Sequence, residues 1–317
     1  MELITWFDGL PEENIGNIAG GKGASLCRLY KNGFPVIEGF IVCAGAFERF
    51  MEENGLWDQV YAKLDSIDWG NNERLSETGE AVRGLIAGAP MPGDIAGLLA
   101  DYYRRLGDGA PVAVRSSGTA EDLDDASFAG QQETFLYVIG EKDLLHSVKA
   151  CWASLYNDRA IFYRHEKRFS ERKISIAVVV QRMVHSEKAG VMFSANPINK
   201  DRGAVMIEGS WGLGEGVVQG IVNPDNYIVR KGTYEAEMEY IPEKEIMVVR
   251  NAGQSGVVEA EVPENLRNEP VLTEDERKEL VDLAVRAEGF YGKPQDLEWA
   301  VEGGKIYLLQ SRPITTL

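Results

Sequence analysis

The spacing of apolar and polar residues along the chain predicts both helices and strands. From Ala24 onward, apolar residues recur at helical spacing until Gly33 ends the helix. Thr273 followed by Glu276 is a capping-box signature for a helix that runs to about Tyr291. Strand-like segments are predicted at residues 3–7, 35–43, 111–117, 175–184, 189–197 and 203–209, with further strands within 227–250. Because helices and strands do not alternate regularly, the pattern favours an α+β fold over a doubly wound parallel sheet.

The C-terminal segment predicts a two-stranded hairpin with one polar face. Alternation puts Asp296 and Glu298 on the same side of the first strand. If residues 303–305 form a three-residue loop, Glu298 lies opposite Gln310, and Asp296 lies opposite Arg312. A two-residue loop would separate these pairs, so a role for them in one site requires this register.

Composition narrows the function classes. The chain has 44% hydrophobic and 26% charged residues, which is ordinary globular usage, and no apolar run long enough for a membrane helix. Its net charge of -17 disfavours binding to nucleic acids or anionic membranes. The N-terminal segment lacks the features of a secretory signal, so we expect a cytoplasmic protein. The widely spaced Cys27, Cys43 and Cys151 indicate reduced, buried thiols and no structural zinc.

A glycine-rich segment at residues 16–23 is a first candidate phosphate site. It fits the phosphate-binding P-loop pattern except that Gly23 stands where Ser or Thr would bind magnesium. The glycines still allow close backbone approach to a phosphate, and Lys22 adds a positive charge at the start of a helix. The alternative is a helix entry with a solvated lysine.

A second candidate is Arg115 at the end of an apolar strand. A guanidinium can bind two phosphate oxygens at once, and the hydroxyls of Ser116, Ser117 and Thr119 are nearby donors. The acidic run at residues 121–125 offers an alternative, in which Arg115 belongs to a structural ion network.

Further segments fit other parts of a nucleotide. Gln181, at the end of a buried strand, can contact the edge of an adenine, although most such strands are only core. The segment around Gly130 favours a mobile flap over phosphates. The glycine-rich loop at residues 212–220 either closes on the nucleotide or is a flexible turn.

The predicted hairpin supplies oxygen ligands. Magnesium bound to a nucleotide takes one or two carboxylates together with phosphate and water oxygens, which suits Glu298, the carbonyl of Gln310 and Asp296. Arg312 would then face the phosphates. The alternative is a solvated polar face in which Asp296 and Arg312 form an exposed ion pair.

Taken together, these segments resemble the ATP-binding domain of the phosphoenolpyruvate synthase, pyruvate phosphate dikinase and rifampin phosphotransferase family. The resemblance covers nearly the whole chain. It is carried, in order, by GGKGASL, VRSSGTAEDLDDASFAGQQETFL, CWASLYNDRAIFYR, VVVQRMV, AGVMFSANP, GLGEGVVQG, DLEWAV and LLQSRPIT.

The resemblance implies an ATP-grasp-like fold with two lobes, at about residues 1–185 and 186–317, that clamp Mg-ATP. The implied roles are phosphate binding for Lys22, Arg115 and Arg312, adenine binding for Gln181, magnesium binding for Glu298 and Gln310 with Asp296 beside the metal, and flap positions for Gly130 and Thr134.

In this family a β,γ-pyrophosphoryl group passes from ATP to a histidine on a separate swivelling domain, and AMP is released. The sequence contains no glycine- and threonine-rich histidine loop and no acceptor-binding domain. The resemblance therefore implies a histidine-bearing partner, either as a separate subunit, as in phenylphosphate synthase, or as the rest of a longer chain. Two alternatives are an ATP-grasp ligase that activates a carboxylate and releases ADP, and a module that senses ATP without turnover.

Overall fold

The computed structural model describes residues 2–119, 133–166, 174–252, 254–315 and 317. The chain divides into two compact units. Unit 1 comprises residues 1–28 and 38–183, and unit 2 comprises residues 29–37 and 184–317. The division after residue 183 lies close to the lobe boundary expected near residue 185. The assignment of residues 29–37 to unit 2 has no counterpart in the sequence pattern.

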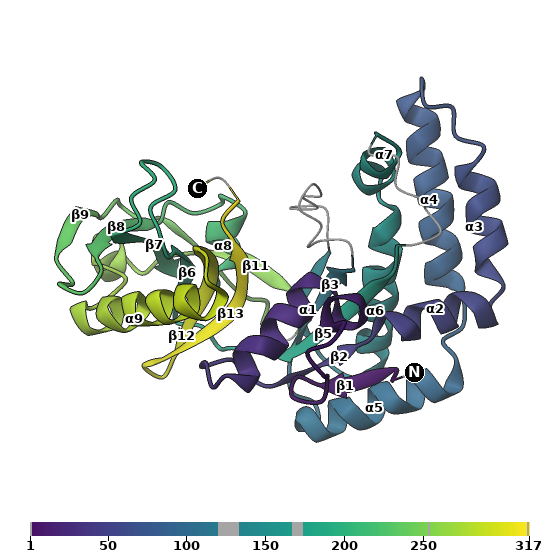
Figure 1. The fold of residues 1–317 in the computed structure, drawn as a ribbon, viewed down its shortest axis with the longest axis horizontal. Helices are drawn as coiled ribbons and strands as arrows, with labels where there is room; N and C mark the ends of the chain where they lie inside the picture. Colours follow the sequence, from purple (N-terminus) through teal and green to yellow (C-terminus); the bar gives the residue numbers. More distant parts are fainter. Residues whose placement is uncertain (1, 120–132, 167–173, 253, 316) are drawn as a thin grey trace. The chain divides into compact units, whose positions relative to one another are not determined.

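Unit 1 is built on a five-stranded antiparallel sheet with the order β1-β2-β5-β3-β4 (Figure 1). Segments far apart in the sequence therefore become neighbours, since β5 pairs with both β2 and β3. The strands are β1 (Ile4–Trp6), β2 (Gly39–Val42), β3 (Val112–Gly118), β4 (Thr134–Val138) and β5 (Ile176–Arg182).

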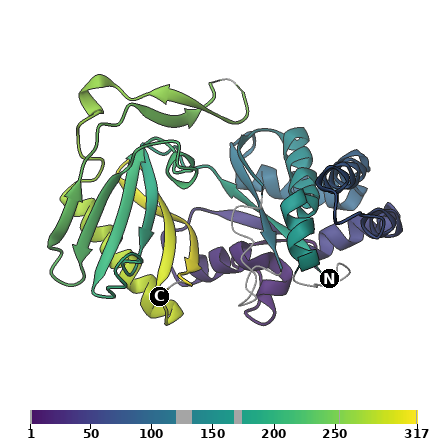
Figure 2. The same cartoon turned by 90° about the horizontal axis from the view of Figure 1, so that it is seen from above.

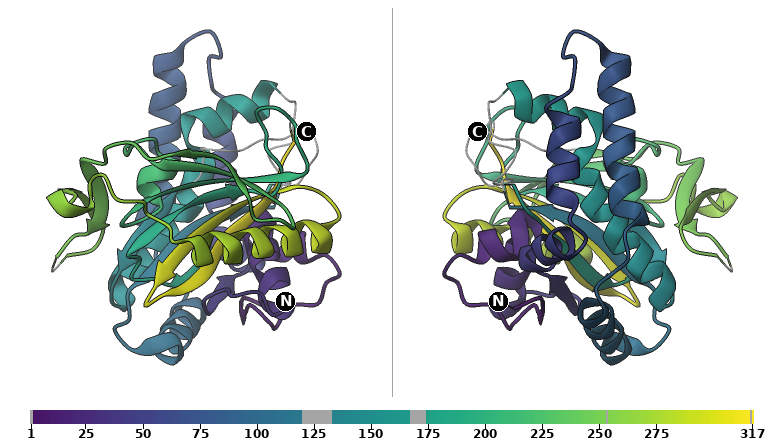
Figure 3. Two further views of the ribbon diagram at one scale, coloured as in Figure 1. Left: turned by 90° about the vertical axis from the view of Figure 1, so that its left-hand side faces the viewer. Right: turned by 90° about the vertical axis from the view of Figure 1, so that its right-hand side faces the viewer.

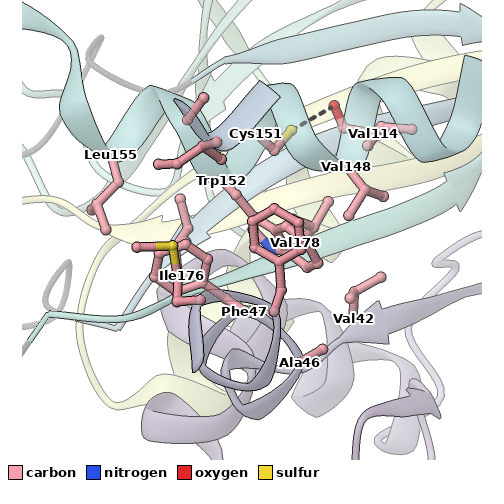
Figure 4. Close-up of a cluster of buried hydrophobic side chains, with 14 of the residues drawn as sticks. Val42, Ala46, Phe47, Val114, Val148, Cys151, Trp152, Leu155, Ile176 and Val178 are labelled. Carbon is pink, nitrogen blue, oxygen red and sulfur yellow. Dashed lines mark hydrogen bonds between the residues drawn. The ribbon is translucent and has the colours of Figure 1, made fainter. Parts of the chain in front are cut away.

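Helices pack on one face of this sheet and form the core of unit 1. Alternate residues of the strands, such as Val114 and Val178, are fully buried with Phe47 and Trp152 from the helices (Figure 4). The thiol of Cys151 donates to the Val114 carbonyl at 3.8 Å. The helical elements of this core are α2 (Ala44–Glu53), α3 (Leu56–Leu64), α4 (Asn72–Gly88), α5 (Gly93–Gly107), α6 (Glu141–Ala153), η1 (Ser154–Tyr156) and α7 (Asp158–Glu166).

The helix α1 (Ile15–Lys31) contains a break at Gly20. The sequence pattern predicts a helix only from Ala24, but the structure begins it at Ile15 and interrupts it at Gly20, where φ is 68° and ψ is 175°. This conformation is essentially restricted to glycine because a side chain would meet the backbone. A second helical segment therefore begins immediately before Lys22.

The hydroxyl of Ser117 on β3 holds the two sides of this break. It accepts a hydrogen bond from the Gly23 N–H at 3.0 Å and donates one to the Ala19 carbonyl at 2.7 Å. Both groups belong to a helix interruption, where the backbone lacks its usual partners. The break in α1 is thus tied to β3, on the face of the sheet opposite the helical core.

Replacing Gly20 by alanine is expected to lower the stability of the chain. The backbone conformation alone costs about 1–3 kcal/mol for a residue other than glycine. In addition, a Cβ atom at this position would lie 2.2 Å from the Ser117 carbonyl oxygen. Urea unfolding measures the loss. Gly84→Ala, inside α4 and with no atom within 4 Å of its added Cβ, is the matched control and should not destabilise. Equal stability of the two variants would contradict the strain assigned to Gly20.

Unit 2 is built on a six-stranded antiparallel sheet with the order β13-β12-β6-β7-β8-β9. The helix α9 (Glu274–Tyr291) lies along one face of it (Figure 3). The capping box predicted at Thr273 and Glu276 is confirmed, and the helix ends at Gly292 in a left-handed conformation. The strands are β6 (Lys188–Phe193), β7 (Ala204–Trp211), β8 (Asp225–Arg230), β9 (Ala236–Tyr240), β12 (Gln295–Glu302) and β13 (Lys305–Pro313).

Cross-strand pairs identify which side chains face α9. Lys188 lies opposite Val301, and its amine contacts Glu276 of α9 at 2.7 Å. Since opposite residues share a face, Val301 and, by alternation, Trp299 and Leu297 point toward α9. All three are fully buried. The intervening Asp296 and Glu298 therefore lie on the other face of the sheet.

A small hairpin projects from the six-stranded sheet (Figure 2) and consists of β10 (Ile246–Arg250) and β11 (Val257–Glu261). Lys244, in the segment that leads into this hairpin, forms a buried ion pair with Asp225 on β8. Its amine lies 2.6 Å from the Asp225 carboxylate. Both side chains are fully buried. Asp225 also accepts hydrogen bonds from the Tyr227 hydroxyl at 2.9 Å and the Val271 N–H at 2.7 Å. These bonds connect β8 to the segments before β10 and α9.

The mixture of helices and antiparallel sheets confirms the predicted α+β class. Cys27, Cys43 and Cys151 are buried and form no disulfide, and burial raises the pKa of Cys43 to about 12. Among the helices in the described ranges, none is both long and apolar enough to cross a bilayer. The described part of unit 2 also contains the short elements α8 (Glu215–Val218) and η3 (Glu264–Leu266).

Candidate functional site

Three of the predicted nucleotide-binding residues share one face of the sheet in unit 1. Arg115 on β3 lies directly opposite Thr134 on β4 and Val179 on β5. Gln181 lies opposite Ala113, two positions along the same face. This face is opposite the helical core. Gln181 is buried, Arg115 is half-buried and Thr134 is exposed.

Lys22 belongs to the same unit and follows the break in α1 by two residues. It is half-buried. The Ser117 hydroxyl fixes this part of α1 to β3, and Ser117 lies two positions from Arg115 on the same face of the strand. Lys22 and Arg115 are therefore presented by directly connected elements. Backbone N–H groups at the start of a helical segment, together with two cations, suit an anionic group such as a phosphate.

The three hydroxyls next to Arg115 have structural roles, which differs from the expectation that they are phosphate donors. Ser116 donates to the Glu133 carbonyl at 3.1 Å, and Thr119 donates to the Ser175 carbonyl at 2.9 Å. The Ser117 hydroxyl binds α1. Sequence could not reveal this because the acceptors lie far away along the chain. Gly130 and the acidic run at residues 121–125 lie outside the described residues.

In unit 2 the predicted register of the C-terminal hairpin is confirmed, although the predicted loop is wrong. Glu298 pairs with Gln310 and Asp296 with Arg312. The turn has only two residues, Gly303 and Gly304, both with positive φ (57° and 74°). A β-bulge between the Glu298 and Trp299 positions restores the pairing by adding one residue, Leu309, to β13.

Arg312 and Asp296 form an ion pair at 2.8 Å, with their side chains 56% and 12% exposed. Burial raises the pKa of Asp296, and the neighbouring Arg312 opposes that shift. Gln310 is buried and Glu298 is half-buried beside this pair. The hairpin thus presents two carboxylates, one amide and one guanidinium on the sheet face that α9 leaves uncovered.

Sequence reasoning missed Glu208 on β7. The register runs from Glu298 to Val191 on β6 and on to Glu208, so all three share the face opposite α9. Glu208 is half-buried, and burial together with Asp296 raises its pKa. The signal was present in the sequence, because Val205 and Ile207 are buried on the α9 face and alternation leaves Glu208 on the other.

The glycine-rich loop at residues 212–220 lies over the same face of unit 2. A Cβ atom added to Gly214 would contact Ala189, and Ala189 lies two positions from Val191 on β6. Glu215 at the start of α8 is a further residue without a sequence-based prediction. Its Oε1 accepts from the Gln219 amide at 2.6 Å, while its buried Oε2 has no hydrogen-bond partner among the described residues. Burial raises its pKa.

Oxygen donors for a metal ion are present only as a partial set. Within the described ranges, no three His, Cys, Asp or Glu side chains form a group that could hold a metal ion by themselves. Glu298, Asp296 and the Gln310 carbonyl are hard oxygen donors of the kind that magnesium takes when phosphates and waters complete its shell.

Comparison with known proteins shows strong sequence similarity along the whole chain. A probable phosphoenolpyruvate synthase of Methanothermobacter thermautotrophicus is 46% identical over all of this chain and 46% of its own length. One of Methanocaldococcus jannaschii is 45% identical over all of this chain and 27% of its own length. A rifampicin phosphotransferase of a Streptomyces species is 39% identical over 94% of this chain and 34% of its own length.

The chain therefore spans less than half the length of these relatives. Among solved structures, D-alanyl-alanine synthetase A from Vibrio cholerae aligns with 70% of this chain and 47% of its own, at 11% identity and a TM-score of 0.32, which is too distant to bear on the fold. The model of the family described as the AMP/ATP-binding domain of pyruvate phosphate dikinase matches residues 16–317. The chain belongs to the pyruvate phosphate dikinase AMP/ATP-binding domain family.

Proposed function

We propose that this protein binds Mg-ATP and donates the β,γ-pyrophosphoryl group to a histidine on a separate domain or subunit, releasing AMP. The strongest support is the register of the β12–β13 hairpin, taken together with the membership of the chain in an ATP-binding family. It places Glu298 beside Gln310 and Asp296 beside Arg312 on the sheet face opposite α9. A register shifted by one residue would have turned one strand's set of polar groups toward α9.

The cations Lys22, Arg115 and Arg312 would bind the phosphates. Positive groups of this kind offset the charge that develops on a transferred phosphoryl group, and they act by position rather than by covalent chemistry. Arg115 and Thr134, paired across β3 and β4, would contact the same part of the nucleotide. Gln181 would contact the adenine. Gly130 would belong to the flap.

Magnesium would be held by Glu298 and the Gln310 carbonyl, with Asp296 beside it. The donors fit because they are oxygens and leave room for phosphates and waters. When bound, the ion neutralises phosphate charge and polarises the phosphoryl group. Arg312 forms an ion pair with Asp296 beside these donors. This chain's own contribution is to orient the nucleotide and hold the carboxylates in register.

A histidine-bearing partner and an acceptor-binding component complete the proposed reaction. This is supported by the greater length of the relatives, of which the chain covers 27–46%. The partner is either a separate subunit or further sequence of the same protein.

Buried thiols without disulfides support a cytoplasmic location.

Calorimetric titration with ATP and magnesium, followed by nucleotide analysis in the presence of candidate histidine-domain proteins, tests the proposal. We expect ATP binding by the chain alone, and AMP with a phosphorylated histidine only when the partner is added. ADP formed with a carboxylate substrate would instead indicate a ligase. Binding without turnover in any mixture would indicate a sensor, and no ATP binding would refute the proposal altogether.

A further inference from the structure

We propose that Glu208 is a positioning residue for the nucleotide's magnesium ion and holds it through a metal-bound water, from the side opposite Gln310. This inference rests on the proposed function, because it extends the metal site assigned there to Glu298. The pairing of β6 with β7 aligns Glu208 with the proposed metal site. None of the residues predicted from the sequence lies on its strand, β7.

The first observation is the row of side chains that crosses the sheet. Gln310, Glu298, Val191 and Glu208 lie opposite one another on β13, β12, β6 and β7. Strands are spaced by about 4.8 Å, so Glu298 and Glu208 begin roughly 10 Å apart, with only the short apolar Val191 between them. Glutamate side chains are long enough to extend over the valine from both strands, so a hydrated cation can span the gap that remains between their carboxylates.

The second observation is the charge of Glu208 itself. Its side chain is half-buried, and no described residue forms an ion pair or side-chain hydrogen bond with it. The adjacent Asn226 on β8 does not fill this role, since its amide donates to the Pro224 carbonyl at 3.1 Å. Asp296, by contrast, is paired with Arg312. A partly buried carboxylate without a counter-charge is costly unless a cation is supplied from elsewhere.

The chemistry of magnesium favours contact through water. The described side chains do not form a three-carboxylate group close enough to bind a metal directly. Magnesium keeps several of its waters when it is bound with phosphates. Groups in the outer shell that accept hydrogen bonds from such waters typically change metal affinity 10- to 100-fold.

Manganese binding measured by electron paramagnetic resonance, with a non-hydrolysable ATP analogue present, tests the inference. Glu208→Gln should weaken manganese binding about 10- to 100-fold. Binding of the analogue without metal should be unchanged, which a merely structural defect would not allow. Glu279→Gln, on the exposed side of α9, removes the same charge from the opposite face and should have no effect.

Glu298→Gln separates the two levels of the proposal. If it weakens manganese binding while Glu208→Gln does not, the further inference is overturned and the assigned metal site stands. If neither variant has an effect, the metal site itself is refuted. Should Glu208→Gln fail to fold, Glu208→Ala takes its place with the same expected loss, and wild-type manganese affinity in that variant would equally overturn the inference.

Discussion

Replacing Lys244 by methionine is expected to destabilise the chain by about 3–5 kcal/mol, because the carboxylate of Asp225 would stay buried without its cation. Both side chains of this pair are fully buried. The remaining donors, the Tyr227 hydroxyl and the Val271 N–H, are neutral and cannot replace the charge. Urea unfolding followed by tryptophan fluorescence measures the loss, since Trp211 and Trp299 belong to the same unit.

Two controls make this result specific. Adding Asp225→Asn to Lys244→Met removes the stranded charge while an amide oxygen can still accept a hydrogen bond, so part of the lost stability should return. Arg74→Ala removes an exposed ion pair with Glu77 and should cost under about 1 kcal/mol. If Lys244→Met were no more harmful than Arg74→Ala, the buried pair would have no structural importance.

Replacing Arg115 by alanine is expected to weaken ATP binding roughly 10- to 100-fold while adenosine binding stays unchanged. The reason is the proposed contact with phosphate, since a hydrogen bond to a charged group contributes about 1.5–3 kcal/mol. Arg115 is half-buried and faces away from the helical core, so the fold should survive. Calorimetric titration of the variant with ATP and with adenosine measures both affinities.

Arg115→Lys separates the charge from the shape of the guanidinium. A lysine keeps the positive charge but cannot bind two phosphate oxygens in a planar arrangement, so it should recover only part of the affinity. Equal losses for adenosine and ATP in Arg115→Ala would contradict the phosphate assignment and point instead to a general defect of the β3–β4 face.

Much of the fold follows from local pattern, and the exceptions have a common cause. The capping box at Thr273 and the hairpin at the C-terminus are short-range features, and both are present. The break at Gly20 was not predicted, because it depends on β3 lying against α1, almost a hundred residues away in sequence. The partnership of Asp225 with Lys244 was equally hidden, since two ordinary charged residues 19 positions apart give no periodic signal.

The candidate site shows the same division. The cross-strand pairs at Glu298 and Asp296 were predicted from a three-residue loop, but the structure reaches the same register with a two-residue turn and a β-bulge at Leu309, which the sequence pattern did not indicate. Alternation along β7 could have placed Glu208 on the polar face of its strand, but its position in line with Glu298 depends on which strand pairs with β6, and the sequence pattern does not give that pairing. The hydroxyls of Ser116 and Ser117 were misassigned because residue type alone cannot distinguish a ligand donor from one engaged by backbone.

Because Leu309 is an extra residue in β13, the odd- and even-numbered residues of this strand exchange faces of the sheet at that point. Before it, the residues facing α9 are even-numbered, as at Ile306 and Leu308; after it they are odd-numbered, as at Ser311. An insertion or deletion of one residue within this strand therefore turns every side chain beyond it to the opposite face of the sheet. Loss of one residue at the bulge would leave the turn intact and still exchange the polar and buried faces of everything that follows.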